Sequence, residues 1–250
     1  MAVCAAFFCG CSGSANDVNT LLQMAVKEAQ NGKNSNALML AKDACIVSPD
    51  NVEALLMRAL MAERCNDKTL ALDSALQAFR LASNNFNVLY TLGRLYSYNK
   101  DTAAEAVGYL TKAHALKEDD VNTLILLANL SVALKSDKAL GYLRKIESLD
   151  SSVLDTFEGK TMLGHAYALR GDKRNATINF GLADKYAKTV LSNYNYAVAI
   201  DCLYNKPALA VSKYQKFLKQ SAADPAWASI RKDVEKRMSK NKKNSSRRSR

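Results

Sequence analysis

The stretch FEGKTMLGHAYALRGDKRNATINFGLADKYAKTV, residues 157–190, decides the fold of this chain. Its apolar and small positions follow helical spacing on both sides of the polar segment 170–173, which predicts two short helices joined by a turn. Gly164 and Ala176 are small where the two helices cross, so the helix axes can approach to about 8–10 Å. Tyr167 and Phe180 supply the bulk that fills the space beside that crossing.

The spacing of these positions resembles the tetratricopeptide repeat (TPR). That family has a Leu-Gly pair, a Tyr, an Ala, a Phe and a second Ala at the intervals found here, and Lys160 stands where the family has a Trp. The resemblance implies a helical hairpin that stacks on similar hairpins and a scaffold that binds other proteins. It assigns to the repeat core the residues Gly93, Tyr96, Leu163, Gly164, Tyr167, Ala176, Phe180 and Ala183.

The same pattern recurs along the chain with a period of about 34 residues. We expect six units, with bounds at 18–51, 52–85, 86–120, 121–152, 157–190 and 191–223. The third unit carries one extra residue in the turn near Asn99-Lys100-Asp101. A generic helical bundle would not place small residues in phase at this period, so the sequence predicts an all-α TPR superhelical solenoid over residues 16–223.

A solenoid needs a terminal element with a polar outer face, and residues 224–239 are expected to form such a capping helix. Asp224 is placed to cap it ahead of Pro225. One helical stripe is apolar and includes Trp227, which we expect to pack on the sixth unit; its other members are Ile230, Val234 and Met238. The opposite face is expected to point into solvent with Arg231, Lys232, Glu235 and Lys236.

The net charge of +11 is concentrated near the C-terminus. From Ala226 onward there are ten Lys and Arg against two acidic residues. Residues 240–250 contain no apolar side chain, so we expect a disordered basic tail. It could contact an acidic partner, a wall polymer or anionic lipid, or simply keep the chain soluble; nucleic acid is disfavoured because the body lacks a basic aromatic surface.

Residues 1–15 are expected to be a lipoprotein signal and tether. An apolar run ends at Phe8-Cys9-Gly10-Cys11 and is followed by Ser-Gly-Ser, which resembles a bacterial lipobox with Cys11 as the lipidated residue. The run is short and has no Lys or Arg before it, and a start codon assigned too far downstream would explain both departures. The alternative is a frayed apolar N-terminus on a cytosolic protein.

The sequence predicts no enzyme, no metal and no cofactor. The two histidines, His114 and His165, lie in different repeats, and no His/Cys/Asp cluster has the spacing of metal ligands. No phosphate loop, dinucleotide motif, nucleophile elbow or His-Glu-x-x-His occurs. Cys45, Cys65 and Cys202 are too widely spaced for a zinc site, and we expect them to be small buried hydrophobic residues.

In TPR proteins the first helix of each hairpin lines a concave groove that binds partner segments. Carried onto this sequence, the resemblance implies a groove lined by Tyr90, Arg94, Tyr98, Asn122, Asn129, His165 and Tyr194. The Lys/Asn clamp of the chaperone-binding TPR domains is absent, because its places in the first two units hold Leu22, Val26, Leu56 and Leu60. The groove entrance is therefore expected to suit a hydrophobic helix or strand of a partner.

A six-repeat chain with a lipobox-like start resembles the TPR lipoproteins of the tight-adherence (Flp-type) pilus and the type IV pilus pilotins. The resemblance implies a lipid anchor at the bacterial envelope, on the periplasmic face of the outer membrane, and another envelope protein as partner. Two alternatives stay open: a cytoplasmic TPR adaptor or chaperone, and a scaffold that recruits a cell-wall enzyme.

Overall fold

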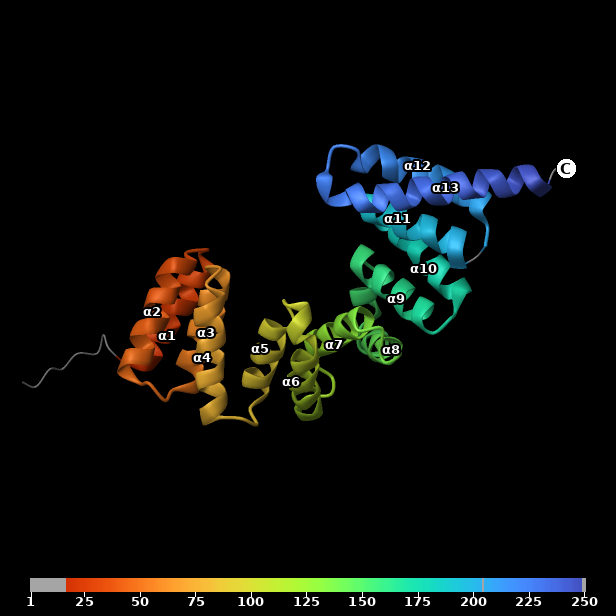
Figure 1. Cartoon of the computed structure of the whole chain (residues 1–250). Helices are drawn as coiled ribbons and strands as arrows, with labels where there is room; N and C mark the ends of the chain where they lie inside the picture. The colour runs from red at the N-terminus through yellow and green to blue at the C-terminus, as the bar shows by residue number, and fades with distance from the viewer. Residues whose placement is uncertain (1–16, 204, 249–250) are drawn as a thin grey trace, which may run out of the picture. The chain divides into compact units, whose positions relative to one another are not determined.

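The computed structural model describes residues 17–203 and 205–248, with side chains up to residue 240. Two compact units divide at Glu118, and each is described here by itself. Within the described ranges the backbone forms helices and turns without a strand. The predicted all-α architecture of six helical hairpins followed by a terminal helix is confirmed (Figure 1).

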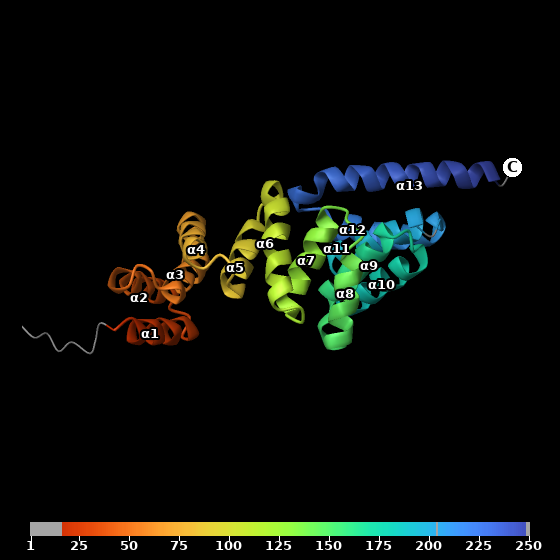
Figure 2. The same cartoon turned by 90° about the horizontal axis from the view of Figure 1, so that it is seen from below.

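The first unit is a stack of three hairpins in which each helix packs on the next one along the chain (Figures 1 and 2). A short 3-10 helix, η1 (Lys100–Thr102), precedes the last helix. The α-helices are α1 (Val18–Gln30), α2 (Asn34–Val47), α3 (Val52–Arg64), α4 (Lys68–Leu81), α5 (Phe86–Tyr96) and α6 (Ala103–Leu116).

The second unit contains the other three hairpins and the terminal helix α13 (Ala228–Arg248). Irregular helical segments are η2 (Ser151–Leu154), the π-helix η3 (Ala199–Leu203) and η4 (Pro225–Trp227). The hairpin helices are α7 (Val121–Ala133), α8 (Ala139–Leu149), α9 (Phe157–Leu169), α10 (Lys173–Tyr186), α11 (Val190–Val198) and α12 (Pro207–Ser221).

Small side chains lie buried where the two helices of a hairpin cross. On the second helices these residues are Ala37, Ala71, Ala106, Ala139, Ala176 and Ala210. On the first helices, a Cβ added at Gly164 would lie 2.7 Å from the Phe180 ring, and one at Gly93 would lie 2.5 Å from Leu110 Cγ. Larger residues at these positions would force the hairpin apart.

The structure places the other repeat-core residues around these crossings. Leu163, Phe180 and Ala183 are buried. Tyr167 is half-buried and packs against the clusters on both sides of α9. Tyr96 is half-buried, and its ring stacks on Tyr109 with centroids 5.5 Å apart.

Five hairpin turns reverse the chain through one residue in the left-handed region. These residues are Gly32, Asn66, Lys135, Gly171 and Asn205, with φ between 53° and 75°. Such a residue ends the first helix and starts the return within a few residues. The turn between α5 and α6 has no such residue and runs over 97–102 instead, with η1 inside it.

The terminal helix caps the sixth hairpin through the expected stripe. Trp227 packs edge to face on Phe217 with ring centroids 5.7 Å apart, and Val234 is fully buried. Ile230 and Met238 pack against the same cluster. Asp224 accepts a hydrogen bond from the Ala226 N–H, as expected for a capping residue.

Two details of this region differ from the sequence prediction. Arg231 was expected to face solvent, but its guanidinium donates to the Ser221 carbonyl and to the Asp224 carbonyl at 2.8 Å. The end of α12 leaves carbonyl groups that such a donor satisfies. The helix α13 continues to Arg248, where disorder was expected after residue 239. Lys and Arg have good helix propensity, and extending a formed helix costs little.

The expectation of three buried cysteines is wrong for two of them. Cys45 is buried, Cys65 is half-buried and Cys202 is exposed. The Cys202 Sγ accepts a hydrogen bond from the Arg237 guanidinium at 2.8 Å. Cys202 lies in the π-helix η3, where an extra residue per turn rotates side chains away from the positions that a regular repeat predicts.

Gly164→Ala and Gly141→Ala form a matched test of the hairpin crossing. At Gly141 the added methyl group meets nothing within 4 Å, so this substitution should stabilise α8 by about 0.5–1 kcal/mol through helix propensity. At Gly164 the methyl group meets the Phe180 ring, which should cost about 1–3 kcal/mol. In urea unfolding followed by circular dichroism, Gly164→Ala should have the lower free energy of unfolding. Equal stability of the two variants would contradict a tight crossing.

Candidate functional site

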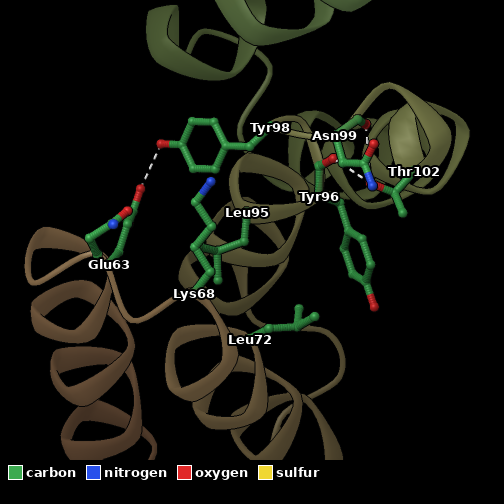
Figure 3. A pocket seen from close by; sticks show the side chains of 9 residues that line it. Glu63, Lys68, Leu72, Leu95, Tyr96, Tyr98, Asn99 and Thr102 are labelled. Carbon is green, nitrogen blue, oxygen red and sulfur yellow. Dashed lines mark hydrogen bonds between the residues drawn. The ribbon is translucent and has the colours of Figure 1, made fainter.

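A pocket of about 790 Å³ lies in the first unit between the second and third hairpins (Figure 3). It is formed by the end of α3, the start of α4, the end of α5 and the long turn that follows. The lining residues are Glu63, Asn66, Lys68, Leu72, Leu95, Tyr96, Tyr98, Asn99 and Thr102.

The long turn shapes one wall of this pocket. Asn99 Oδ1 accepts from the Asp101 N–H at 3.0 Å and starts η1. The Thr102 hydroxyl donates to the Tyr96 carbonyl at 2.7 Å, which ties the start of α6 back to the end of α5. Leu72 and Leu95 contribute apolar wall. The turn therefore holds polar groups at the rim of an apolar hollow.

Glu63, Arg94 and Tyr98 form a polar cluster that joins α3 to α5. The Tyr98 hydroxyl donates to Glu63 Oε1 at 2.6 Å (Figure 3). The Arg94 guanidinium pairs with the same oxygen, and the two charged side chains are only 18% and 16% exposed. Burial, and then the Glu63 carboxylate, raise the pKa of Tyr98, so its hydroxyl stays protonated as a donor.

The cluster leaves hydrogen-bonding capacity unused. Glu63 Oε2 is buried and has no partner among the described residues. The Lys68 side chain extends toward the space beneath the Tyr98 ring (Figure 3), and in the described part of the chain no carboxylate forms an ion pair with it. A buried carboxylate oxygen normally has a donor. A ligand with a carbonyl or carboxylate oxygen would complement the Lys68 ammonium group.

The predicted groove residues are placed unevenly. Tyr90, Arg94 and Tyr98 lie four residues apart along α5 and the turn after it. Only Tyr98 lines the pocket. Tyr90 stacks on Phe86 with ring centroids 6.0 Å apart, and Lys117 Nζ lies 4.3 Å from the Phe86 centroid.

The other four predicted groove residues belong to the second unit. Asn122 and Asn129 are exposed on α7, two helical turns apart. His165 is half-buried with its ring edge to face on Phe180, and loss of solvent lowers the pKa of its imidazole. Tyr194 is half-buried against Phe217, with centroids 5.3 Å apart. Both rings therefore contribute to packing within their hairpins.

Two of the four residues predicted at the apolar groove entrance, Leu22 and Val26, line a depression in the structure, whereas Leu56 and Leu60 do not line it. The depression of about 320 Å³ lies on α1 and α3 and is lined by Leu22, Gln23, Val26, Glu53 and Met57. Val26 is 40% exposed, whereas Leu22 is buried. The depression is smaller than the pocket beside Tyr98.

Most of the pocket residues were not singled out by the sequence. Glu63, Lys68 and Leu72 lie at ordinary repeat positions, and nothing in their local sequence marks them. One signal was present: the extra residue near Asn99-Lys100-Asp101 breaks the repeat period where the pocket opens. A break in a regular repeat is a reasonable place to look for a site.

The described residues contain no group of three or more His, Cys, Asp and Glu side chains that could hold a metal ion. Among these residues no helix combines the length and the apolar character needed to cross a bilayer.

Comparisons with known proteins identify the fold. No protein-family model and no curated protein matches the chain. PilF of Pseudomonas aeruginosa superposes with a TM-score of 0.66 at 15% identity, over 86% of this chain and 97% of that one. PilW, a widely conserved type IV pilus biogenesis factor, superposes with a TM-score of 0.67 at 15% identity, over 85% of this chain and 97% of that one.

A third solved structure is YrrB, a TPR protein with an unusual peptide-binding site. Its TM-score is 0.58 at 16% identity, over 72% of this chain and 91% of that one. At such identities the likeness establishes the fold alone. The chain has the TPR fold, a class of helical-repeat architecture that serves many binding functions.

Arg94→Met tests the cluster at the pocket rim. The substitution leaves the Glu63 carboxylate with one donor, so it should lower the free energy of unfolding by about 1–3 kcal/mol. The double variant Glu63→Met/Arg94→Met removes both charges and should recover part of this loss. Arg80→Met changes an exposed arginine of the same unit and should stay within about 0.5 kcal/mol of the parent. Chemical denaturation measures all three, and a double variant that is less stable than Arg94→Met would contradict the pairing.

Proposed function

We propose that this chain is a non-enzymatic scaffold that binds a segment of a partner protein at the pocket beside Tyr98. The preset orientation of Tyr98 is the observation that carries the proposal. The residue is 59% exposed while its hydroxyl donates to Glu63. An aromatic side chain that is already fixed loses little conformational entropy when a partner packs on it. Such residues are frequent hot spots of protein interfaces.

The pocket matches the chemistry of an extended peptide. Leu72 and Leu95 can receive an apolar side chain. The Lys68 ammonium group can donate to a carbonyl or carboxylate oxygen of the peptide. Backbone groups supply affinity in such complexes, and the side-chain pocket supplies selectivity.

We further propose that the partner is another envelope protein, within an assembly such as a pilus or secretion apparatus. The support is a likeness at the level of the fold to PilF and PilW, which extends over most of each chain. A shared fold does not by itself assign a function. The peptide-binding site named for YrrB, also a TPR protein, supports a peptide ligand in the same limited way.

A lipid anchor at Cys11 remains part of the proposal. Cys11 lies outside the described residues, and its support is the lipobox-like sequence Phe8-Cys9-Gly10-Cys11. Lipidation there would hold the chain at the bacterial envelope, on the periplasmic face of the outer membrane. One acyl chain binds a membrane only marginally, so stable anchoring takes more than one attachment.

Tyr98→Ala tests the pocket as the binding site. In a pull-down from detergent-solubilised membranes of the source cells, the parent chain should retain a specific partner that Tyr98→Ala loses. Tyr186→Ala removes a comparably exposed tyrosine, 52% against 59%, and should keep that partner. Thermal unfolding should show that both variants are folded. A partner that is retained equally by both variants would place binding elsewhere.

Cys11→Ala tests the anchor. The intact mass of the natively expressed parent should show cleavage before Cys11 and an added acyl mass, and the chain should partition with membranes. Both the processing and the added mass should disappear in Cys11→Ala. A parent chain that is unprocessed and soluble would contradict the anchor and would favour a cytoplasmic adaptor.

A further inference from the structure

The net charge of the chain is divided very unequally between its two units. Residues 1–118 contain 11 Lys and Arg and 11 Asp and Glu, so their formal charges cancel. Residues 119–250 contain 24 Lys and Arg against 13 Asp and Glu, which accounts for the whole net charge of +11. The second unit is therefore the part of the molecule that attracts anions over long range.

Part of this charge forms an exposed stripe on α13. Lys232, Lys236 and Lys240 are exposed and follow one another at intervals of four residues. In an α-helix that interval is a rise of about 6 Å with only a small rotation, so the three residues share one side of the helix. No ion pair involves them within the described residues. Glu235, which lies three residues after Lys232, is the exposed carboxylate on this helix.

The apolar residues and the two arginines in the described part of α13 are already engaged within the unit. Ile230, Val234 and Met238 pack on the core of α11 and α12. Arg231 donates to carbonyl groups at the end of α12. Arg237 donates to Asp233 at 2.6 Å and to Cys202 at 2.8 Å. Within residues 228–240, whose side chains are described, the helix therefore offers an external ligand a row of ammonium groups, because its apolar residues and both of its arginines are engaged.

We propose that this stripe binds the surface of a membrane that contains anionic phospholipid. Ammonium groups act as point charges that suit a plane of phosphate headgroups. Sequence-tolerant binding of single-stranded nucleic acid usually adds aromatic stacking, and α13 contains no aromatic residue. Bidentate phosphate recognition would use arginines, and the two arginines of α13 with described side chains, Arg231 and Arg237, are held by the Ser221 and Asp224 carbonyls and by Asp233.

The same features define how the binding should behave. The apolar side of α13 is buried, so the helix cannot insert into the acyl region, and attachment should be electrostatic and reversible by salt. Each lysine close to an anionic surface should contribute about fivefold in the partition coefficient. Beyond the stripe the sequence adds Lys242, Lys243, Arg247, Arg248 and Arg250 without an acidic residue, which should strengthen the attraction.

Vesicle co-sedimentation of the full chain tests this inference. The parent should bind phosphatidylcholine vesicles that contain phosphatidylglycerol more tightly than vesicles of phosphatidylcholine alone, and high salt should remove the difference. The triple variant Lys232→Gln/Lys236→Gln/Lys240→Gln should bind the anionic vesicles about 100-fold more weakly. Gln and Lys have similar helix propensities, so α13 should remain folded. Circular dichroism checks that the triple variant is helical.

A matched control separates the stripe from net charge. Lys27→Gln/Lys42→Gln/Lys112→Gln removes three exposed lysines of the first unit and should leave the anionic preference unchanged. Equal partition to both vesicle types, an unaffected stripe variant, or an equal loss in the control would each overturn the proposal. Tighter binding to single-stranded RNA or duplex DNA than to the anionic vesicles at the same salt would overturn it in favour of nucleic acid. Because the readout is the difference between two lipids, it does not depend on the pocket or on acylation at Cys11.

Discussion

The close approach of two helices at small side chains is the constraint on which each hairpin depends. Gly164 against Phe180 and Gly93 against Leu110 leave no room for a Cβ atom. With the axes this close, the next layer of side chains is buried almost completely, as with Leu92, Leu127 and Leu143. Because each hairpin has an apolar face left over, it is stable only when the neighbouring hairpin or a capping helix covers that face. Stacking within each unit follows from this need.

The third hairpin shows how a repeat can gain a site without losing its core. Its crossing at Gly93 is as tight as the crossing at Gly164 in the fifth hairpin. Its turn contains η1 and has no residue in the left-handed conformation that the other five turns use. Tyr98 lies in this longer turn, at the edge of the pocket, and its hydroxyl donates a hydrogen bond to Glu63. Loops tolerate such insertions because they carry few buried contacts. The hollow beside Tyr98 is a consequence of that local change.

Charged side chains have two different roles in this molecule, depending on whether they are buried or exposed. Where burial is high, as at Asp184, which is 6% exposed and pairs with Lys213, the charges satisfy one another and join neighbouring helices. Lys232, Lys236 and Lys240 are exposed instead, and they form no ion pair with another described residue. A buried charge without a partner is costly, whereas an exposed one is solvated at little cost. Only the second kind is free to attract an external ligand.

The sequence by itself determined the hairpins, their order, the small residues at their crossings and the apolar side of α13 that packs on the sixth hairpin. Each of these is a pattern of local spacing. The tertiary structure decided what depends on contacts between distant residues. Glu63 and Tyr98 are 35 positions apart, and no local pattern links them. The same reason explains the errors: Arg231 turned toward α12, and Cys202 turned outward in the π-helix, because helix ends and an irregular turn set their direction. Repeats reveal what neighbouring hairpins share, whereas the pocket arises where one hairpin departs from the others.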